Sequence, residues 1–405
     1  MKKFNKVLSV VVASAMVMAM AGCGNTDNGS AATGTNAATE SAAADNGAAS
    51  GSVFKIGGIG PTTGGAAVYG LAVQHGAEIA VEEINAAGGI NGYQVEFKFQ
   101  DDEADAEKSV NAYNALKDWG MQVLIGTTTS APCIAVVEKT HADNMFQITP
   151  SGSAVECVQY DNNFRVCFSD PNQGLASAQY IGENGLAEKI AVIYDSSDVY
   201  SSGIYEKFVK EAENQPFEVV AAEAFTADNK TDFSVQLQKA KDAGADMVFL
   251  PIYYQESALI LTQAAAMGYA PKWFSCDGMD GILGGVDNFD VSLTEGVMLL
   301  TPFAADATDD LTQSFVTKYK EKYGETPNQF AADSYDAIYV IKAAIEKSGV
   351  TPDMSVSDIC DGMKAAMTEI TVDGLTGNGM TWTADGEANK APKAVVIENG
   401  AYKAM

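Results

Sequence analysis

Apolar residues after position 53 recur with two alternating periods, one typical of β-strands and one typical of α-helices. An apolar run at 53–60 ends in a glycine-rich turn, and residues 70–87 then place apolar side chains on one helical face at Val73, Ala77, Ala80 and Ile84. The pattern continues with predicted strands at 93–99, 122–126 and 145–149 and predicted helices at 104–119 and 134–142. This alternation predicts a doubly wound sheet of parallel strands.

A second series of the same kind begins at residue 189. It comprises predicted strands at 189–194, 217–225, 246–251 and 273–276 and predicted helices at 203–213, 233–243 and 257–267. The 405 residues therefore hold two similar α/β units in tandem, which suits a chain long enough for two domains. Helices near 311–323, 329–348 and 356–368 and a strand near 394–397 follow, and periodicity does not say where these helices pack.

The first 52 residues predict secretion and attachment to a membrane surface. Residues 1–22 carry three lysines followed by an apolar run, which is the pattern of a signal peptide. The run ends in Met-Ala-Gly-Cys23, which resembles a bacterial lipobox, so we expect Cys23 to be lipid-modified; the alternative is a plain signal peptide with an incidental cysteine. Small and polar residues fill 24–52, and we expect 23–52 to form a lipidated, flexible tether.

Composition excludes several classes of partner and chemistry. The net charge of −28 disfavours nucleic acid and other polyanions. Arg165 is the only arginine, so a site for a carboxylate must use hydroxyls, backbone N–H groups or lysine. With two distant histidines, His75 and His141, and no C-x-x-C pair, we expect no metal site and no cofactor.

Five cysteines remain after Cys23, and their odd number favours at least one buried free thiol. They lie at Cys133, Cys157, Cys167, Cys276 and Cys360. Cys157 and Cys167 are close enough in sequence to close a small loop, and the sequence leaves that pairing open.

Enzyme signatures are weak or missing. The sequence has no G-x-S-x-G, P-loop or H-E-x-x-H motif. The glycines at 58, 60 and 64 only loosely match a dinucleotide fingerprint. We interpret the acidic run 101–103 as a solvated strand end rather than a calcium loop.

Two turns rich in hydroxyl groups follow neighbouring strands of the first unit. They read GTTTSAP at 126–132 and PSGS at 150–153. Ligands of open parallel sheets bind at the carboxyl ends of strands, where helix N-termini also offer N–H groups. We therefore expect the two turns to bind a carboxylate, the alternative being helix capping alone.

The sequence resembles the solute-binding lipoproteins of branched-chain amino acid ABC transporters, the leucine/isoleucine/valine-binding family. The similarity runs from about residue 53 to the C-terminus and is carried by KIGGIGPTTG, EINAAGGINGYQVEF, DDEAD, VLIGTTTSAP, ITPSGSA, FRVCFSDPNQG, AVIYDSSDVYSSG, DFSVQLQKAKDAGADMVFLPIYY and WFSCDG. The resemblance implies a type I periplasmic binding protein: an α/β fold of two Rossmann-like lobes with parallel-sheet cores, joined by a three-strand hinge. It implies an N-lobe of 53–170 plus 302–371 and a C-lobe of 171–301 plus 372–405.

The resemblance also implies a role for individual residues. Ser130 and Ser153 match positions that hold the ligand carboxylate, and Ser151 matches one whose carbonyl accepts from the ligand ammonium. Asp277 matches an acid that pairs with the ammonium, where the best-known members carry glutamate, and Tyr253 matches a nearby tyrosine. Positions around the ligand side chain are matched by Tyr69, Tyr200 and Phe330.

These features predict a non-enzymatic, extracytoplasmic binding protein. We expect a monomer, lipid-anchored to the bacterial membrane, that captures a neutral and branched-chain amino acid between its lobes and delivers it to a permease. One alternative keeps the fold but binds a short amide, urea or an aromatic acid. The other is a surface hydrolase, which lacks an evident base.

Overall fold

The computed structural model describes residues 51–405. The predicted signal peptide, Cys23 and the tether up to residue 50 lie outside the described residues. Among residues 51–405, no helix combines the length and the apolar character needed to cross a membrane.

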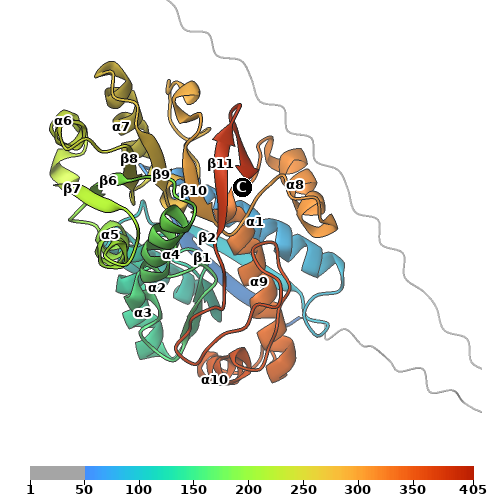
Figure 1. Ribbon diagram of the computed structural model, residues 1–405. Helices are drawn as coiled ribbons and strands as arrows, with labels where there is room; N and C mark the ends of the chain where they lie inside the picture. The colour runs from blue at the N-terminus through green and yellow to red at the C-terminus, as the bar shows by residue number, and fades with distance from the viewer. Residues whose placement is uncertain (1–50) are drawn as a thin grey trace, which may run out of the picture. The chain divides into compact units, whose positions relative to one another are not determined.

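The first of two sheets is parallel throughout and has the strand order β2-β1-β3-β4-β5. Its strands are β1 (Phe54–Gly60), β2 (Val95–Asp101), β3 (Val123–Ile125), β4 (Phe146–Thr149) and β5 (Asn163–Arg165). Helices α1 (Ala67–Ala86), α2 (Ala106–Trp119) and α3 (Ser130–Asp143) connect them. The doubly wound parallel sheet predicted for this unit is confirmed (Figure 1).

Alternation of apolar side chains along the strands places a helical layer on each face of this sheet. One face buries Ile56 and Ile125 in the same cluster as Val73 of α1, whereas Ile59 and Leu124 point to the other face and pack with α2 and α3. The four residues that defined the predicted helical face of α1 are all buried.

The second sheet has the order β12-β11-β10-β9-β8-β6-β7. Its strands are β6 (Lys189–Asp195), β7 (Glu218–Phe225), β8 (Met247–Leu250), β9 (Lys272–Ser275), β10 (Met298–Thr301), β11 (Lys393–Glu398) and β12 (Ala401–Ala404), and the last two pair antiparallel. Helices α4 (Asp170–Glu183) and α5 (Val199–Ala212) pack on one face, and α6 (Ser234–Asp242) and α7 (Tyr254–Ala266) on the other. The tandem second unit is therefore confirmed.

The three late helices, which periodicity left unplaced, return to the first sheet. They are α8 (Asp310–Tyr323), α9 (Gln329–Ser348) and α10 (Val356–Met367). Helix α9 lies along α1, where Gly76 leaves room for the Ala331 backbone: a Cβ there would lie 2.0 Å from the Ala331 carbonyl oxygen. Each sheet with its helices forms one lobe, and the chain crosses between the lobes after β5, after β10 and before β11.

The bounds predicted for the two lobes stay a prediction. Two hydrogen bonds made by residues after 372 favour a later position for the last of these bounds. The indole Nε1 of Trp382 donates to the backbone oxygen of Arg165 in β5 at 2.8 Å. The N–H of Leu375 donates to Asp336 of α9 at 2.8 Å. Residues 372–388 thus pack against the first lobe. This packing favours a position near Lys390, rather than at 372, for the last crossing of the chain between the lobes.

Candidate functional site

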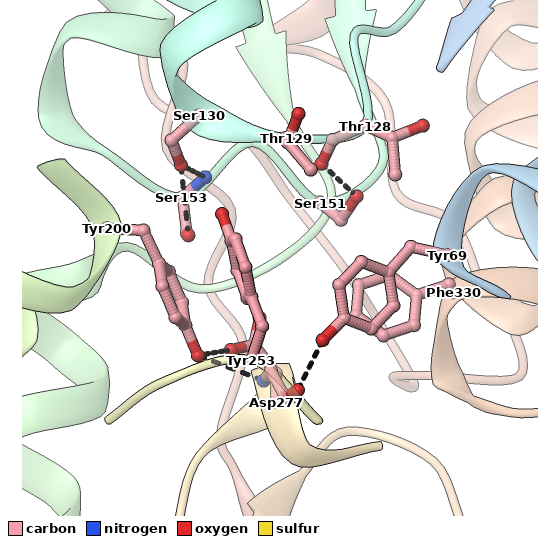
Figure 2. A pocket seen from close by; sticks show the side chains of 11 residues that line it. Tyr69, Thr128, Thr129, Ser130, Ser151, Ser153, Tyr200, Tyr253, Asp277 and Phe330 are labelled. Atoms are coloured by element: carbon pink, nitrogen blue, oxygen red, sulfur yellow. Dashed lines mark hydrogen bonds between the residues drawn. The ribbon is translucent and has the colours of Figure 1, made fainter. Parts of the chain in front are cut away.

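A pocket between the lobes brings together all eight residues that the sequence singled out (Figure 2). From the first lobe come Tyr69, Ser130, Ser151, Ser153 and Phe330, and from the second come Tyr200, Tyr253 and Asp277. Thr128, Thr129 and Gly278 complete the lining. Their role in binding stays a prediction, but their convergence from seven separate segments is a structural fact.

Aromatic rings occupy much of the space in this pocket. The lining side chains border about 240 Å³ of space, part of it open to solvent, and little of this space is wide enough to admit a water molecule. A small organic molecule therefore enters only after side chains rotate or the lobes separate.

Ser130 joins the two hydroxyl-rich turns of the first lobe. It is the first residue of α3, and its Oγ accepts from the backbone N–H groups of Ser153 at 3.1 Å and Ala154 at 3.2 Å. Its Oγ also lies 3.5 Å from the Oγ of Ser153. The side chain thus bonds to the second turn and makes no capping bond to its own helix, so capping alone does not explain it.

The second turn is tied to the first by further hydroxyl bonds. The Oγ of Ser151 donates to the Thr128 carbonyl at 2.6 Å, and the Oγ1 of Thr149 donates to the Thr127 carbonyl at 2.7 Å. Both serines facing the pocket are buried, with Ser130 and Ser153 each 1% exposed. The turns form a rigid surface of hydroxyl and N–H groups, which suits an anion.

Asp277 supplies the negative charge on the opposite side of the pocket. It follows β9 and opens the short 3-10 helix Asp277–Met279. Its Oδ1 accepts from the hydroxyl of Tyr200 at 2.7 Å, while no lysine, arginine or histidine of residues 51–405 forms an ion pair with it. Burial raises the pKa of this carboxyl to about 6, although hydrogen bonds from Tyr200 and Gln173 oppose the shift.

Four aromatic residues surround the centre of the pocket. The rings of Tyr200 and Tyr253 stack with centroids 5.0 Å apart, and those of Tyr69 and Phe330 lie 4.4 Å apart. The Tyr69 hydroxyl reaches across to the other lobe, where it donates to the Gly278 carbonyl and accepts from the N–H of Tyr254 at 3.2 Å. The aromatic side of the pocket thus also holds the lobes together.

Three lining residues were not among the predicted site residues. Gly278 follows Asp277 directly, and a Cβ there would lie 2.5 Å from the Tyr200 hydroxyl oxygen, so the close approach of this tyrosine requires glycine. Thr128 and Thr129 belong to the run of four hydroxyl residues that signalled the site. Their place in the pocket lining could have been predicted from that run. No sequence pattern indicated that Gly278 also lines the pocket.

The acidic run 101–103 is not simply a solvated strand end, and that interpretation is wrong for Asp102. Its side chain is 0% exposed, and its Oδ1 accepts from the N–H of Ala104 at 2.9 Å. The chain turns back at Glu103 and Ala104, both with positive φ, and this turn carries the carboxylate inward. Burial raises the pKa of Asp102 to about 7.

All five cysteines of residues 51–405 are buried free thiols, so the expectation of a buried thiol is confirmed. Cys157 is not bonded to Cys167. In the same part of the chain, no group of three or more histidine, cysteine, aspartate or glutamate side chains is arranged to hold a metal ion.

Two α/β lobes with a buried site between them, offering an anion-binding face opposite a lone carboxylate, define a solute-binding protein of the two-lobed kind. The chain belongs to the periplasmic binding protein family, whose profile matches residues 53–401. This is a family of binding proteins and not of enzymes.

Two relatives and one solved structure to which the chain is similar carry names or titles that refer to amino acids. A Leu/Ile/Val-binding protein homolog 3 from Brucella melitensis is 30% identical over 300 residues, which cover 74% of this chain and 80% of the relative. A leucine-, isoleucine-, valine-, threonine-, and alanine-binding protein from Pseudomonas aeruginosa is 30% identical over 303 residues, covering 73% and 79%. The crystal structure of the substrate-binding protein LivJ from Streptococcus pneumoniae, in complex with isoleucine, superposes with a TM-score of 0.78 at 28% identity and covers 87% of this chain and 99% of LivJ.

Proposed function

We propose that this protein captures a neutral, branched-chain amino acid outside the cytoplasm and delivers it to the permease of an ABC importer. The observation that carries the proposal is the arrangement of opposite binding faces in one pocket. Ser130 and Ser153 present hydroxyl groups on one lobe, and Asp277 presents a buried carboxylate without a protein cation among residues 51–405 on the other. An α-amino acid zwitterion complements both faces.

Each lining residue has a role in this proposal. The ligand carboxylate accepts from Ser130 and Ser153, and the ammonium donates to Asp277 and to the Ser151 carbonyl. Tyr253 packs beside the ammonium, and the apolar side chain contacts Tyr69, Tyr200 and Phe330. These assignments draw support from the isoleucine complex of LivJ and from the name of the Pseudomonas aeruginosa relative.

Mass spectrometry of the ligand released from purified protein tests the proposal. We expect an unmodified leucine, isoleucine or valine, and titration calorimetry of stripped protein should then show one site per chain for that amino acid. Recovery of an amide, urea or an aromatic acid, together with no heat from amino acids, would contradict it. Turnover of any of these compounds would favour the hydrolase alternative.

We also propose that the protein acts as a monomer attached through a lipid on Cys23, with 24–52 as the tether. The lipobox-like sequence before Cys23 supports the anchor. In cells given a labelled fatty acid, the Cys23→Ala variant should carry no label while the parent protein does. Label that persists in the variant would refute the assignment.

A further inference from the structure

The only arginine of the chain lies behind the hydroxyl face of the pocket. Arg165 ends β5 and is 0% exposed. Its Nη1 donates to the carbonyl oxygens of Gly152 at 3.3 Å and Ser153 at 2.5 Å, and its Nη2 donates to those of Ala154 at 2.9 Å and Val155 at 3.5 Å. One guanidinium thus binds four successive carbonyl groups of the second hydroxyl turn.

Two of these peptide groups connect Arg165 to the binding face. In a trans peptide the C=O of one residue points opposite to the N–H of the next. The peptide between Gly152 and Ser153 has its oxygen on Arg165 and its N–H on the Ser130 Oγ, and the next peptide repeats this arrangement through the N–H of Ala154. The positive ends of both peptide dipoles therefore point toward Ser130, away from the guanidinium.

We propose that Arg165 is the positioning residue of the carboxylate site, acting through these two peptide groups without touching the ligand. The inference rests on the proposed function for the identity of the anion. The guanidinium fixes the orientation of the turn, and its charge favours an anion on the far side of the aligned peptides.

The nearby acidic side chains neutralise the positive charge of Arg165 only in part. Its Nε lies 3.4 Å from an Oε2 of Glu387, a long contact to a side chain that is 35% exposed and so screened by water. Asp170 is the other acid close by; it is 1% exposed, and burial raises the pKa of its carboxyl well above the usual range, although the Ser153 hydroxyl and the charge of Arg165 oppose the shift. This shift reduces the share of the Arg165 charge that Asp170 neutralises.

The backbone of Arg165 is held independently of its side chain. Its N–H donates to the Gly386 carbonyl at 3.0 Å, and its carbonyl accepts from Trp382 at 2.8 Å. Because these bonds involve only the main-chain atoms of Arg165, a substitution of its side chain leaves them in place. This separation makes the role of the guanidinium testable.

Hydrogen exchange provides a test that needs no ligand. In Arg165→Met and Arg165→Lys, the amides of Ser153 and Ala154 should exchange faster by roughly tenfold or more, since neither side chain can bind four carbonyls at once. Glu387→Gln, which alters only the long ion pair, should leave their exchange unchanged. Unchanged exchange in both Arg165 variants, measured on folded protein, would overturn the proposal.

Affinity separates positioning from general stability. By calorimetry, Arg165→Lys should weaken binding of L-leucine by about tenfold or more while changing the affinity for L-leucinamide, which lacks the carboxylate charge, by less than about threefold. Equal losses for both compounds would show a merely structural role and overturn the proposal. If the parent protein binds no amino acid, the proposed function fails, and the exchange experiment still decides the role of Arg165 in the turn.

Discussion

Ser130 and Ser153 are the residues on which carboxylate binding should depend most. Changing both to alanine leaves only backbone donors for the ligand carboxylate, and charge-assisted hydrogen bonds contribute about 1.5–3 kcal/mol each. We expect the double variant to bind leucine at least about tenfold more weakly in calorimetry. Ser257→Ala is a matched control, because Ser257 is 0% exposed in the second lobe and its hydroxyl has no partner in the described chain. A smaller loss in the double variant would mean that these serines only shape the turns.

Asp277 should make ligand affinity depend on pH. Burial raises its pKa to about 6, so below that pH the group is protonated and cannot pair with an ammonium. The ligand ammonium favours the ionised form, and binding therefore releases a proton at low pH. We expect affinity for leucine to be constant from about pH 7 to 8 and to fall by up to about tenfold per pH unit below pH 6.

The Asp277→Asn variant tests both the charge and the pH dependence. Truncating one partner of a buried charge pair costs about 2–5 kcal/mol, so leucine should bind at least about thirtyfold more weakly and with a flat pH profile. The analogue 4-methylpentanoic acid, which lacks the amino group, should bind the variant no worse than the parent. Asp280→Asn is the control: Asp280 is buried nearby, where it accepts from the N–H of Gln329 at 2.8 Å, but it does not line the pocket. Equal losses for both ligands would indicate a disturbed turn instead.

At the scale of elements, Tyr69 connects the N-terminus of α1 to the edge of the second lobe. Its hydroxyl makes two hydrogen bonds across the pocket, to Gly278 and from Tyr254, and each contributes about 0.5–1.5 kcal/mol net. In Tyr69→Phe, the Gly278 carbonyl and the Tyr254 N–H have no partner when the lobes are closed, but both groups are hydrated when the lobes open. The substitution therefore favours the open arrangement of the lobes.

We expect Tyr69→Phe to weaken leucine binding by about fivefold to a hundredfold. Solution scattering at a fixed, subsaturating leucine concentration should give a larger radius of gyration than for the parent. Tyr113→Phe loses a hydroxyl bond to Asp143 within the first lobe and serves as the control. An unchanged affinity would show that this contact does not stabilise closure.

Elements with a long, regular period or a continuous apolar run were mostly predictable from the sequence, and those with neither were not. Helices α1 and α9 have apolar faces that repeat over 20 residues each. In contrast, only Phe164 is apolar in β5, whereas the equally short β3 is apolar throughout, and α4 contains glycine and serine at buried positions such as Gly174 and Ser177. Both were missed, as were β10 and β12.

The chemistry of the site was predictable where it is local in sequence. The two hydroxyl-rich turns predicted an anion site. Only the resemblance to the binding-protein family predicted that Asp277 and the aromatic residues belong to the same site. The contact of Arg165 with the turn depends on the register of β5 beside β4, which no local pattern encodes. The inward turn of Asp102 likewise depends on backbone conformation and not on composition.

Across the whole molecule, buried carboxyl groups should set the pH of greatest stability. Burial raises the pKa of several aspartates, to about 7 for Asp102 and to about 6 for Asp198, Asp280 and Asp336. A carboxyl whose pKa is higher in the folded than in the unfolded chain stabilises the fold below its unfolded pKa, and this stabilisation is lost as pH rises through the folded value. Glu83 acts in the opposite sense: burial disfavours its ionised form, but hydrogen bonds from Lys318 and Tyr335 outweigh this and lower its pKa, so its contribution is lost in acid.

Stability should therefore be greatest in mild acid, near pH 5. We expect calorimetric melting temperatures to fall by several degrees between pH 5.5 and pH 8, and Asp102→Asn to reduce this difference. The same substitution should have little effect at pH 5, where the parent carboxyl is already protonated. A parent melting temperature that rises toward pH 8 would contradict this account.

The packing of α9 along α1 also determines the order in which the polypeptide can fold as it leaves the ribosome. The hydroxyl of Ser334 donates to the Val73 carbonyl, 261 positions earlier, and α9 buries the same face of the first sheet as α1. A nascent chain stalled before Gln329 emerges should thus yield no protease-resistant fragment spanning 53–165, whereas release of the α9 segment should produce one. A resistant fragment at the earlier stage would contradict this. The first half of the polypeptide can therefore fold only after most of the chain has been synthesised. Until then the chain stays unfolded, which is the state in which an exported protein passes through a translocation pore.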